Sequence, residues 1–158
     1  MPVRLQAGPF DIGEEVAALT RGRTDIGAVA TFTGLCRDSD GGEPVRAMTL
    51  EHYPGMAEAE INRHIEEARR RWPLMGVTVI HRYGRLEPGD LIVLVVTASS
   101  HRADAFAAAE FLMDYLKTQA PFWKREERPD GAQWVEARTV DDAAAARWNE
   151  TPKRLTSS

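Results

Sequence analysis

Residues 77–98, VTVIHRYGRLEPGDLIVLVVTA, decide the fold. Two runs rich in β-branched and aliphatic residues, Val77 to Tyr83 and Asp90 to Ala98, are typical of strands. The four residues Leu86-Glu87-Pro88-Gly89 suit a reverse turn between them, because proline presets φ and glycine tolerates a positive φ. Since these strands follow each other without a helix between them, the chain departs from strict β-α-β alternation, and the α+β class is predicted.

Three helices are predicted around this pair of strands. Asp11 is an acidic N-cap for the first. The second runs from about Met56 to Trp72, where apolar residues recur at helical spacing. The third is capped by Ser99 or Ser100 and runs to about Gln119. The residues of this helix that are expected to face inward are Phe106, Ala109, Met113 and Leu116.

The other segments complete a single predicted domain over residues 1–148, followed by a flexible tail at 149–158. Further strands are expected at Ile26 to Thr33 and Val45 to Tyr53, with a polar loop between them at Asp38 to Glu43. The predicted C-terminal elements are a hairpin of Phe122 to Glu127 and Gln133 to Ala137 around Pro129-Asp130-Gly131, and a short helix from Thr139 through Trp148.

Composition excludes several classes of protein. With 20 Lys and Arg against 24 Asp and Glu, and a pI near 5.6, the chain is no polyanion binder held by bulk charge. Its longest aliphatic run, Leu91 to Val96, is far too short to span a membrane, and the N-terminus has no apolar segment typical of a secretion signal. One cysteine, Cys36, allows no internal disulfide. A cytoplasmic domain is expected.

The motifs of several common sites are absent from the sequence. The four histidines are scattered, without the spacing of a metal site, and there is no phosphate-binding glycine loop or nucleophile elbow. Cys36 would be a nucleophile if a neighbouring cation such as Arg37 lowered its pKa. The alternative, a small half-buried apolar residue, is favoured.

Positively charged side chains are the stronger candidates for functional residues. Ser99-Ser100-His101-Arg102 opens a helix, where free N–H groups and the helix dipole suit a phosphate or carboxylate, although a capped helix with two exposed polar residues also fits. Lys117 and Lys124 are the second candidate. Two lysines in one pocket lower each other's pKa, so that one acts as base or nucleophile while the other stabilises negative charge. The alternative is that both are solvated surface lysines.

Two geometric points follow from these positions. In an alternating strand, Phe122, Lys124 and Glu126 share one face, while Trp123 and Arg125 share the other. Arg102 and Lys117 are separated by roughly 22 Å of helix rise, so one small pocket contains both only if a second subunit completes it.

The aromatic and basic segment PFWKREER at residues 121–128 resembles a platform for single-stranded nucleic acid. From His101 to Arg128, however, five cationic side chains are balanced by five acidic ones, which weakens that reading. A nucleic-acid module therefore stays only as an alternative function.

Several segments together resemble the large (catalytic) subunit of molybdopterin synthase, over roughly residues 8–148. The most specific is the block Lys117-Thr118 with Ala120-Pro121-Phe122-Trp123-Lys124-Arg125-Glu126. The others are Thr31-Phe32-Thr33-Gly34 with Arg37, Leu50-Glu51-His52-Tyr53-Pro54-Gly55-Met56, Arg71-Trp72-Pro73-Leu74, Val77-Thr78-Val79-Ile80-His81-Arg82, Ser100-His101-Arg102, Met113-Asp114-Tyr115-Leu116 and Trp134-Val135-Glu136-Ala137-Arg138.

The resemblance implies an α/β hammerhead fold and a sulfurtransferase reaction. The family converts cyclic pyranopterin monophosphate (precursor Z) to molybdopterin by adding two dithiolene sulfurs. The sulfur arrives as a thiocarboxylate on the C-terminus of a small ubiquitin-like subunit, and the assembly is a heterotetramer around a dimer of large subunits. No cofactor or metal is implied, and a non-catalytic scaffold that only binds the ubiquitin-like tail is the alternative.

Site residues follow from the same resemblance. Lys117 and Lys124 match the catalytic lysines, and His101 and Arg102 match residues that the opposite subunit supplies. Leu35 and Cys36, which precede a matching arginine, depart from the family pattern as we know it, and Cys36 is expected only to line the site. The full set expected to bind substrate is Leu35, Cys36, Arg37, His101, Arg102, Arg125, Glu126 and Arg138.

Overall fold

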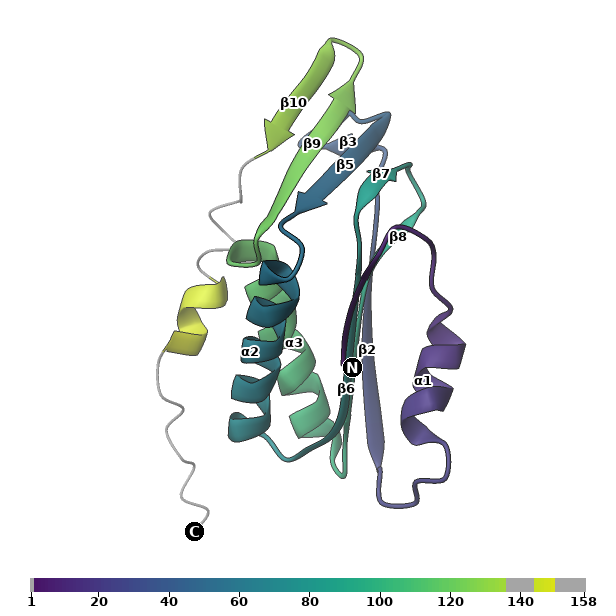
Figure 1. Cartoon of the computed structure of the whole chain (residues 1–158), viewed down its shortest axis with the longest axis vertical. Coiled ribbons are helices and arrows are strands. Elements are labelled where there is room, and N and C mark those ends of the chain that lie inside the picture. Colours follow the sequence, from purple (N-terminus) through teal and green to yellow (C-terminus); the bar gives the residue numbers. More distant parts are fainter. Residues whose placement is uncertain (1, 136–143, 150–158) are drawn as a thin grey trace.

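The computed structural model describes residues 2–135 and 144–149. Its larger sheet contains four strands in the order β1-β6-β8-β2 (Figure 1). Only β1 pairs parallel to its neighbour, β6, and the other pairs are antiparallel. The strands are β1 (Val3–Gln6), β6 (Leu74–Arg82), β8 (Leu91–Ser99) and β2 (Ala28–Leu35).

The strand pair expected from residues 77–98 is present as β6 and β8. The turn before β8 is also confirmed, since the Asp90 backbone N–H donates to Glu87 O at 2.9 Å and Gly89 has φ 93°. Two strands were not predicted: β1, and a short strand that follows Tyr83. Gly84, at φ 89°, redirects the chain into a short strand, β7 (Gly84–Leu86), which pairs with β5 in the second sheet.

The helices cover both faces of the larger sheet. Helices α2 (Met56–Arg71) and α3 (Arg102–Thr118) lie on one face, and α1 (Ile12–Thr20) lies on the other (Figure 1). The main core is between the sheet, α2 and α3, where Ile61, Ile65 and Leu112 are almost fully buried. A smaller core lies under α1. The helices are therefore held by burial of their apolar stripes.

The helices confirm one predicted cap and correct two predictions about α3, its N-cap and the direction of Phe106. Asp11 accepts a hydrogen bond from the Glu14 backbone N–H at 2.9 Å, as expected of an N-cap. Neither Ser99 nor Ser100 caps α3, because β8 extends through Ser99 and His101 is the N-cap residue. Phe106 does not face inward but is 65% exposed, since it lies on the side of α3 turned away from the sheet.

A second sheet, in the order β10-β9-β5-β7, stands at the end of the helices (Figure 1). Its main strands are β5 (Ala47–His52), β9 (Phe122–Arg128) and β10 (Gly131–Val135), and the predicted hairpin of β9 and β10 is confirmed. The expected loop at Asp38 to Glu43 is instead a small two-stranded ribbon, β3 (Ser39–Asp40) with β4 (Glu43–Pro44). Gly41 and Gly42 both have positive φ, which this tight turn requires.

The α+β class with mixed and antiparallel strands and a C-terminal hairpin is confirmed, in the two-sheet arrangement expected of the hammerhead type. The predicted helix from Thr139 lies partly outside the described residues, and the described part ends in a 3-10 turn, η1 (Arg147–Asn149). Residues 150–158 of the expected tail also lie outside them. Within the described residues, no helix is long and apolar enough to cross a membrane.

Candidate active site

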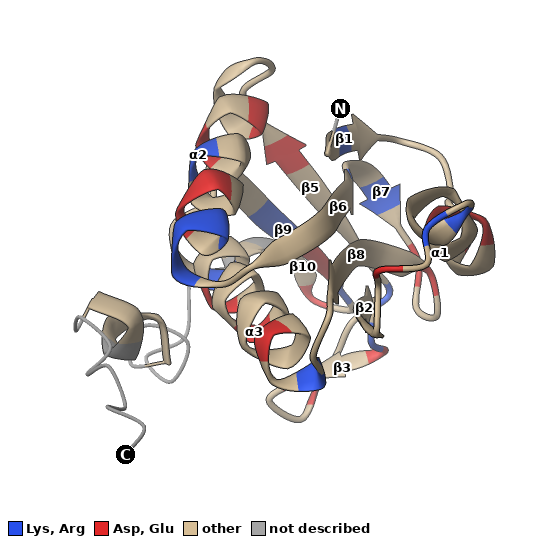
Figure 2. Cartoon of the chain, turned by 90° about the horizontal axis from the view of Figure 1, so that it is seen from below, with Lys and Arg blue, Asp and Glu red and all other residues tan. Residues whose placement is uncertain are grey.

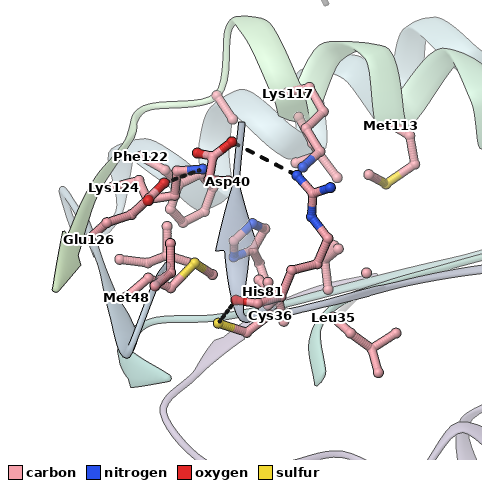
Figure 3. Close-up of a pocket in the computed structure, with 18 of the residues that line it drawn as sticks. Leu35, Cys36, Asp40, Met48, His81, Met113, Lys117, Phe122, Lys124 and Glu126 are labelled. Carbon is pink, nitrogen blue, oxygen red and sulfur yellow. Dashed lines mark hydrogen bonds and ion pairs between the residues drawn. The ribbon is translucent and has the colours of Figure 1, made fainter. Parts of the chain in front are cut away.

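A cavity of about 410 Å³ opens where the two sheets meet the C-terminal end of α3 (Figure 3). Its wall is made by the end of β2 and the residues after it, by β3, β5, β6 and β8, by the last turns of α3 and by β9. The polar and charged side chains in this wall are Arg37, Ser39, Asp40, His81, Lys117, Thr118, Lys124 and Glu126. Lys117 and Lys124, which the family resemblance placed in one pocket, both line this cavity.

The short connection between α3 and β9 explains how the two lysines meet. Helix α3 ends at Thr118, and the Phe122 backbone N–H donates to Ala120 O at 2.8 Å, so the chain reverses tightly around Pro121. Lys117 therefore comes from the last turn of the helix and Lys124 from the strand that begins after the reversal. Both contribute to one cavity.

Strand β9 presents one face to this cavity, as its alternation predicts. Phe122, Lys124 and Glu126 line it, whereas Trp123 and Arg125 do not. The assignment of Arg125 as a substrate-binding residue stays a prediction, because this side chain is exposed on the opposite face of the strand.

Glu126 is a nearly buried carboxylate between two cations. Its Oε1 atom lies 3.5 Å from Lys124 Nζ, and its Oε2 atom lies 3.2 Å from Arg128 Nη2. Only 3% of the Glu126 side chain is exposed, and 37% of that of Lys124. A charge at this depth needs such partners, so Glu126 anchors Lys124 at the cavity wall.

The end of β2 turns toward the same cavity through an irregularity in its pairing. The register with β8 shifts between Gly34 and Leu35, and such a bulge re-aims the residues that follow it. Leu35, Cys36 and Arg37 all line the cavity, and the Arg37 guanidinium lies 3.9 Å from the Asp40 carboxylate. These three predicted positions are therefore brought to the lysines.

Cys36 does not have the environment of an activated thiol. Its side chain is 4% exposed and lies in an apolar cluster with Met48, Leu50 and Leu86. Burial, reinforced by the negative charge of Asp90, raises the pKa of the Cys36 thiol, and the opposing effect of Lys124 is smaller. A thiol with a raised pKa is a poor nucleophile, which favours the apolar reading of this residue.

Three predicted positions are not brought to the cavity by the described chain. His101 and Arg102 are exposed at the opposite end of α3, as the helix rise requires. Arg138 lies outside the described residues. A site that uses His101 and Arg102 together with Lys117 therefore needs a second chain.

Among the ionisable side chains of the cavity wall, the sequence reasoning missed two, Asp40 and His81. Asp40 was placed in a polar loop, and only the ribbon of β3 and β4 places it opposite Arg37. His81 was counted among scattered histidines. A signal was available, because His81 interrupts an apolar strand between Ile80 and Arg82, at a position where a polar side chain requires a partner.

Over the described residues, positive and negative side chains are interspersed on the surface without one basic face (Figure 2). Figure 2 shows blue and red segments interspersed along α2. Exposed pairs such as Glu60 with Arg63 and Glu67 with Arg70 account for this pattern. The described residues contain no group of three or more histidine, cysteine, aspartate or glutamate side chains suited to a metal ion. The cations of the cavity are thus a local arrangement, which argues against a nucleic-acid surface.

Known proteins are similar to this chain along most of its length. A Mesorhizobium japonicum protein named molybdopterin synthase catalytic subunit is 60% identical over 151 residues, which cover 94% of each chain. A solved structure of the molybdopterin biosynthesis MoaE protein from Burkholderia ambifaria matches with TM-score 0.80 and 54% identity, over 94% of this chain and 98% of that one. The crystal structure of molybdopterin synthase from Staphylococcus aureus matches with TM-score 0.79 and 30% identity, over 86% and 98%.

The match extends to a family model. Residues 5–119 fit the model described as MoaE protein, a range that includes β2, the cavity residues after it and Lys117. Since this range is well over half of the 158 residues and the relatives are similar along nearly their whole length, the chain belongs to the MoaE protein family.

Proposed function

We propose that this chain is the catalytic subunit of a molybdopterin synthase. It transfers sulfur from the thiocarboxylated C-terminus of a small ubiquitin-like subunit to precursor Z, forming the dithiolene of molybdopterin. Lys117 and Lys124 on the wall of one cavity, in a chain of the MoaE family, carry this proposal. In this role the chain is a sulfurtransferase that works in the cytoplasm and needs no cofactor of its own.

The cavity suits an anionic substrate and a reaction that develops further negative charge. Arg37 offers a planar guanidinium for the phosphate of precursor Z, while Lys117 and Lys124 stabilise charge that forms during sulfur transfer. The thiocarboxylate sulfur forms a C–S bond at a side-chain carbon of the pterin as the C–O bond at that carbon breaks, and the displaced oxygen leaves as water or stays on the phosphate. Water then cleaves the acyl–sulfur bond to leave a carboxylate on the small subunit. We assign contact with the thiocarboxylate to Lys117, and substrate orientation and proton transfer to Lys124.

A dimer of catalytic subunits completes the site in this proposal. His101 and Arg102 of one subunit enter the cavity of the other, because they are too far from Lys117 of their own chain. The surface beside them supports a contact between chains: Phe106 is one helical turn after Arg102, on the same side of α3, and is 65% exposed. Two small subunits bound to this dimer give the heterotetramer.

Reconstitution tests the function directly. The chain is mixed with a thiocarboxylated small subunit and precursor Z, and a dithiolene product is assayed. Lys117→Ala is expected to lower product formation at least about a hundredfold while the tetramer still assembles. Arg63→Ala, which removes an exposed cation on α2 outside the cavity, is the control and is expected to retain activity.

The same assay separates the enzyme from a scaffold. A scaffold would bind the small subunit and form no product with either the wild-type or the variant chain. Full activity of Lys117→Ala in an intact tetramer would contradict the role given to this lysine.

A further inference from the structure

Arg128 is a largely buried cation that the chemistry proposed above does not use. It is the last residue of β9 and shares a strand face with Lys124 and Glu126, but it does not line the cavity. Only 18% of its side chain is exposed. Removing a guanidinium from water to this extent is unfavourable without a charged partner, and Glu126 is such a partner.

Arg128 holds the carboxylate of Glu126 by one of its two oxygens. The Nε and Nη2 atoms of Arg128 donate to Glu126 Oε2 at 3.3 and 3.2 Å. Two donors from one planar guanidinium fix this oxygen more firmly than a single donor would. The other oxygen, Oε1, lies 3.5 Å from Lys124 Nζ, and Figure 3 marks this contact with a dashed line. Arg128 therefore directs Oε1 of Glu126 to the lysine.

The rest of the surroundings gives the carboxylate little else to bind. Met48, which is paired with Glu126 across β5 and β9, belongs to an apolar cluster. The Glu126 side chain is 3% exposed, so water contributes little, and among the described residues its partners are Lys124 and Arg128. Without Arg128, the orientation of the carboxylate would depend on Lys124 alone, whose long side chain is 37% exposed.

The charge of Arg128 also matters for the cavity. Lys124 and Glu126 alone would form a neutral pair, whereas the two cations and one carboxylate together keep a net positive charge. In the proposed reaction the substrate is an anion and further negative charge develops, so a lysine neutralised by its own carboxylate would stabilise that charge less well. Arg128 offsets the carboxylate from outside the cavity wall.

We infer that Arg128 is a positioning residue for Lys124 and that it acts through Glu126. It holds the carboxylate so that Oε1 fixes the ammonium group, and it offsets the negative charge that this contact brings. The sequence block that resembles the family ends at Glu126, so the resemblance assigns Arg128 no role. The inference rests on the proposed function, in which Lys124 orients the substrate and transfers protons.

Two substitutions of Arg128 test this role. Arg128→Met retains apolar bulk and removes both the charge and the donors, and it is expected to lower kcat for sulfur transfer about tenfold. The KM for precursor Z should change by less than about twofold, because the residues of the cavity wall are unaltered. Arg128→Lys retains the charge without the planar pair of donors, so its kcat should lie between those of Arg128→Met and the wild type.

The matched control is Arg85→Met. It removes an arginine that pairs at 2.9 Å with Glu127, the next glutamate of β9, outside the cavity wall. Its kcat is expected to equal that of the wild type. Urea unfolding of each variant separates positioning from stability: a wild-type kcat in Arg128→Met, with only its stability lowered, would show a purely structural ion pair and overturn the inference.

A double substitution tests whether Arg128 acts through Glu126. In a Glu126→Gln chain the carboxylate is already lost, so adding Arg128→Met is expected to lower kcat by no more than about twofold further. A further tenfold loss would mean that Arg128 affects the reaction by another route, against the inference.

A second measurement needs no catalysis, so it decides the inference even if the proposed function fails. The chain has three lysines, Lys117, Lys124 and Lys153, so ¹H–¹³C spectra of lysine-labelled protein contain few ε-methylene signals, and Lys124→Met assigns the relevant one. This signal is expected to move in Arg128→Met and to stay in place in Arg85→Met. An unmoved Lys124 signal in Arg128→Met would contradict the inference. Absence of product from the wild-type chain counts only against the proposed function.

Discussion

The ammonium nitrogen of Lys124 lies 3.5 Å from Oε1 of Glu126, two residues further along the same strand. Both side chains point to the cavity side of β9, and Arg128 adds a third charge on the other carboxylate oxygen, Oε2. One buried carboxylate thus holds two cations, and it connects the stability of β9 to the position of Lys124, for which we propose a catalytic role.

Glu126→Gln tests this connection. The amide retains the size of the side chain but loses the charge that holds Lys124 and Arg128, so we expect at least about a tenfold loss of sulfur transfer and a loss of about 1 to 3 kcal/mol in the free energy of unfolding. Steady-state kinetics and urea unfolding measure the two effects. Glu127→Gln is the matched control, because Glu127 faces the other side and pairs with the exposed Arg85. It should change stability by less than about 1 kcal/mol.

Cys36→Ser is expected to leave turnover near that of the wild type. The thiol is buried, its pKa is raised by burial, and the serine hydroxyl has carbonyl acceptors available at Arg37 and Leu86. We expect about 1 kcal/mol of lost stability from placing a hydroxyl among apolar side chains. A hundredfold loss of turnover would show that the sulfur of Cys36 takes part in the reaction.

Tyr115→Phe is expected to stabilise the protein by about 1 kcal/mol, because it removes a buried polar group and retains the ring. The Tyr115 hydroxyl has no hydrogen-bond partner among the described residues, and burial raises its pKa to about 12. The ring itself stacks on His64, with centroids 3.3 Å apart. The urea midpoint should rise, whereas Tyr53→Phe, at an exposed tyrosine, should change stability by less than about 0.5 kcal/mol.

Acid is expected to destabilise the fold through His81. Burial lowers its pKa to about 4 in the folded chain, against 6.5 for an unperturbed histidine, so the unfolded state binds a proton first as the pH falls. The contribution of His81 to the free energy of unfolding is complete above pH 6.5. Roughly 3 kcal/mol of it is lost as the pH falls from about 6.5 to 4. Burial also lowers the pKa of His64, so His64 makes the free energy of unfolding fall more steeply with falling pH in the same range.

Comparing variants between about pH 6.5 and 4 separates the contribution of His81 from that of other titrating groups. Urea unfolding at a series of pH values should show a free energy of unfolding that depends less steeply on pH for His81→Phe than for the wild type. Equal slopes for the wild type and His81→Phe would mean that His81 is already accessible to protons in the folded chain.

Mixed dimers test whether two chains share one site. If Arg102 serves the cavity of the opposite subunit, an Arg102→Ala chain and a Lys117→Ala chain are each inactive alone. After subunit exchange, half of the dimers are mixed, and each mixed dimer has one intact cavity, so about a quarter of wild-type activity should return. If mass spectrometry verifies the exchange and no activity returns, Arg102 and Lys117 act in the cavity of their own chain.

Local patterns in the sequence were enough for most elements of this fold. The apolar spacing of α2, the Pro-Gly turn before β8 and the hairpin around Gly131 depend on residues close together in the chain, and each is confirmed. The predicted start of α3 was wrong by one or two residues, because pairing with β2 and β6 extends β8 through Ser99. A tertiary contact overrode the local preference of serine for the N-cap.

The candidate site, too, was predictable from the sequence only in part. The face shared by Phe122, Lys124 and Glu126 follows from strand alternation, and the separation of Arg102 from Lys117 follows from helix rise. The meeting of Lys117 with Arg37, Asp40 and His81 does not, since these residues come from separate elements that are adjacent only after the sheets and α3 pack.

The sequence by itself therefore determined the class of the fold, the resemblance to a family and the pair of lysines, because periodicity and motif spacing act over short distances along the chain. Only the tertiary structure decided that Glu126 is buried between two cations, that Cys36 is a buried thiol and that His81 is a neutral imidazole in the cavity wall. Burial and the distances between charges depend on which elements pack together, and the pKa and reactivity of a side chain depend on both.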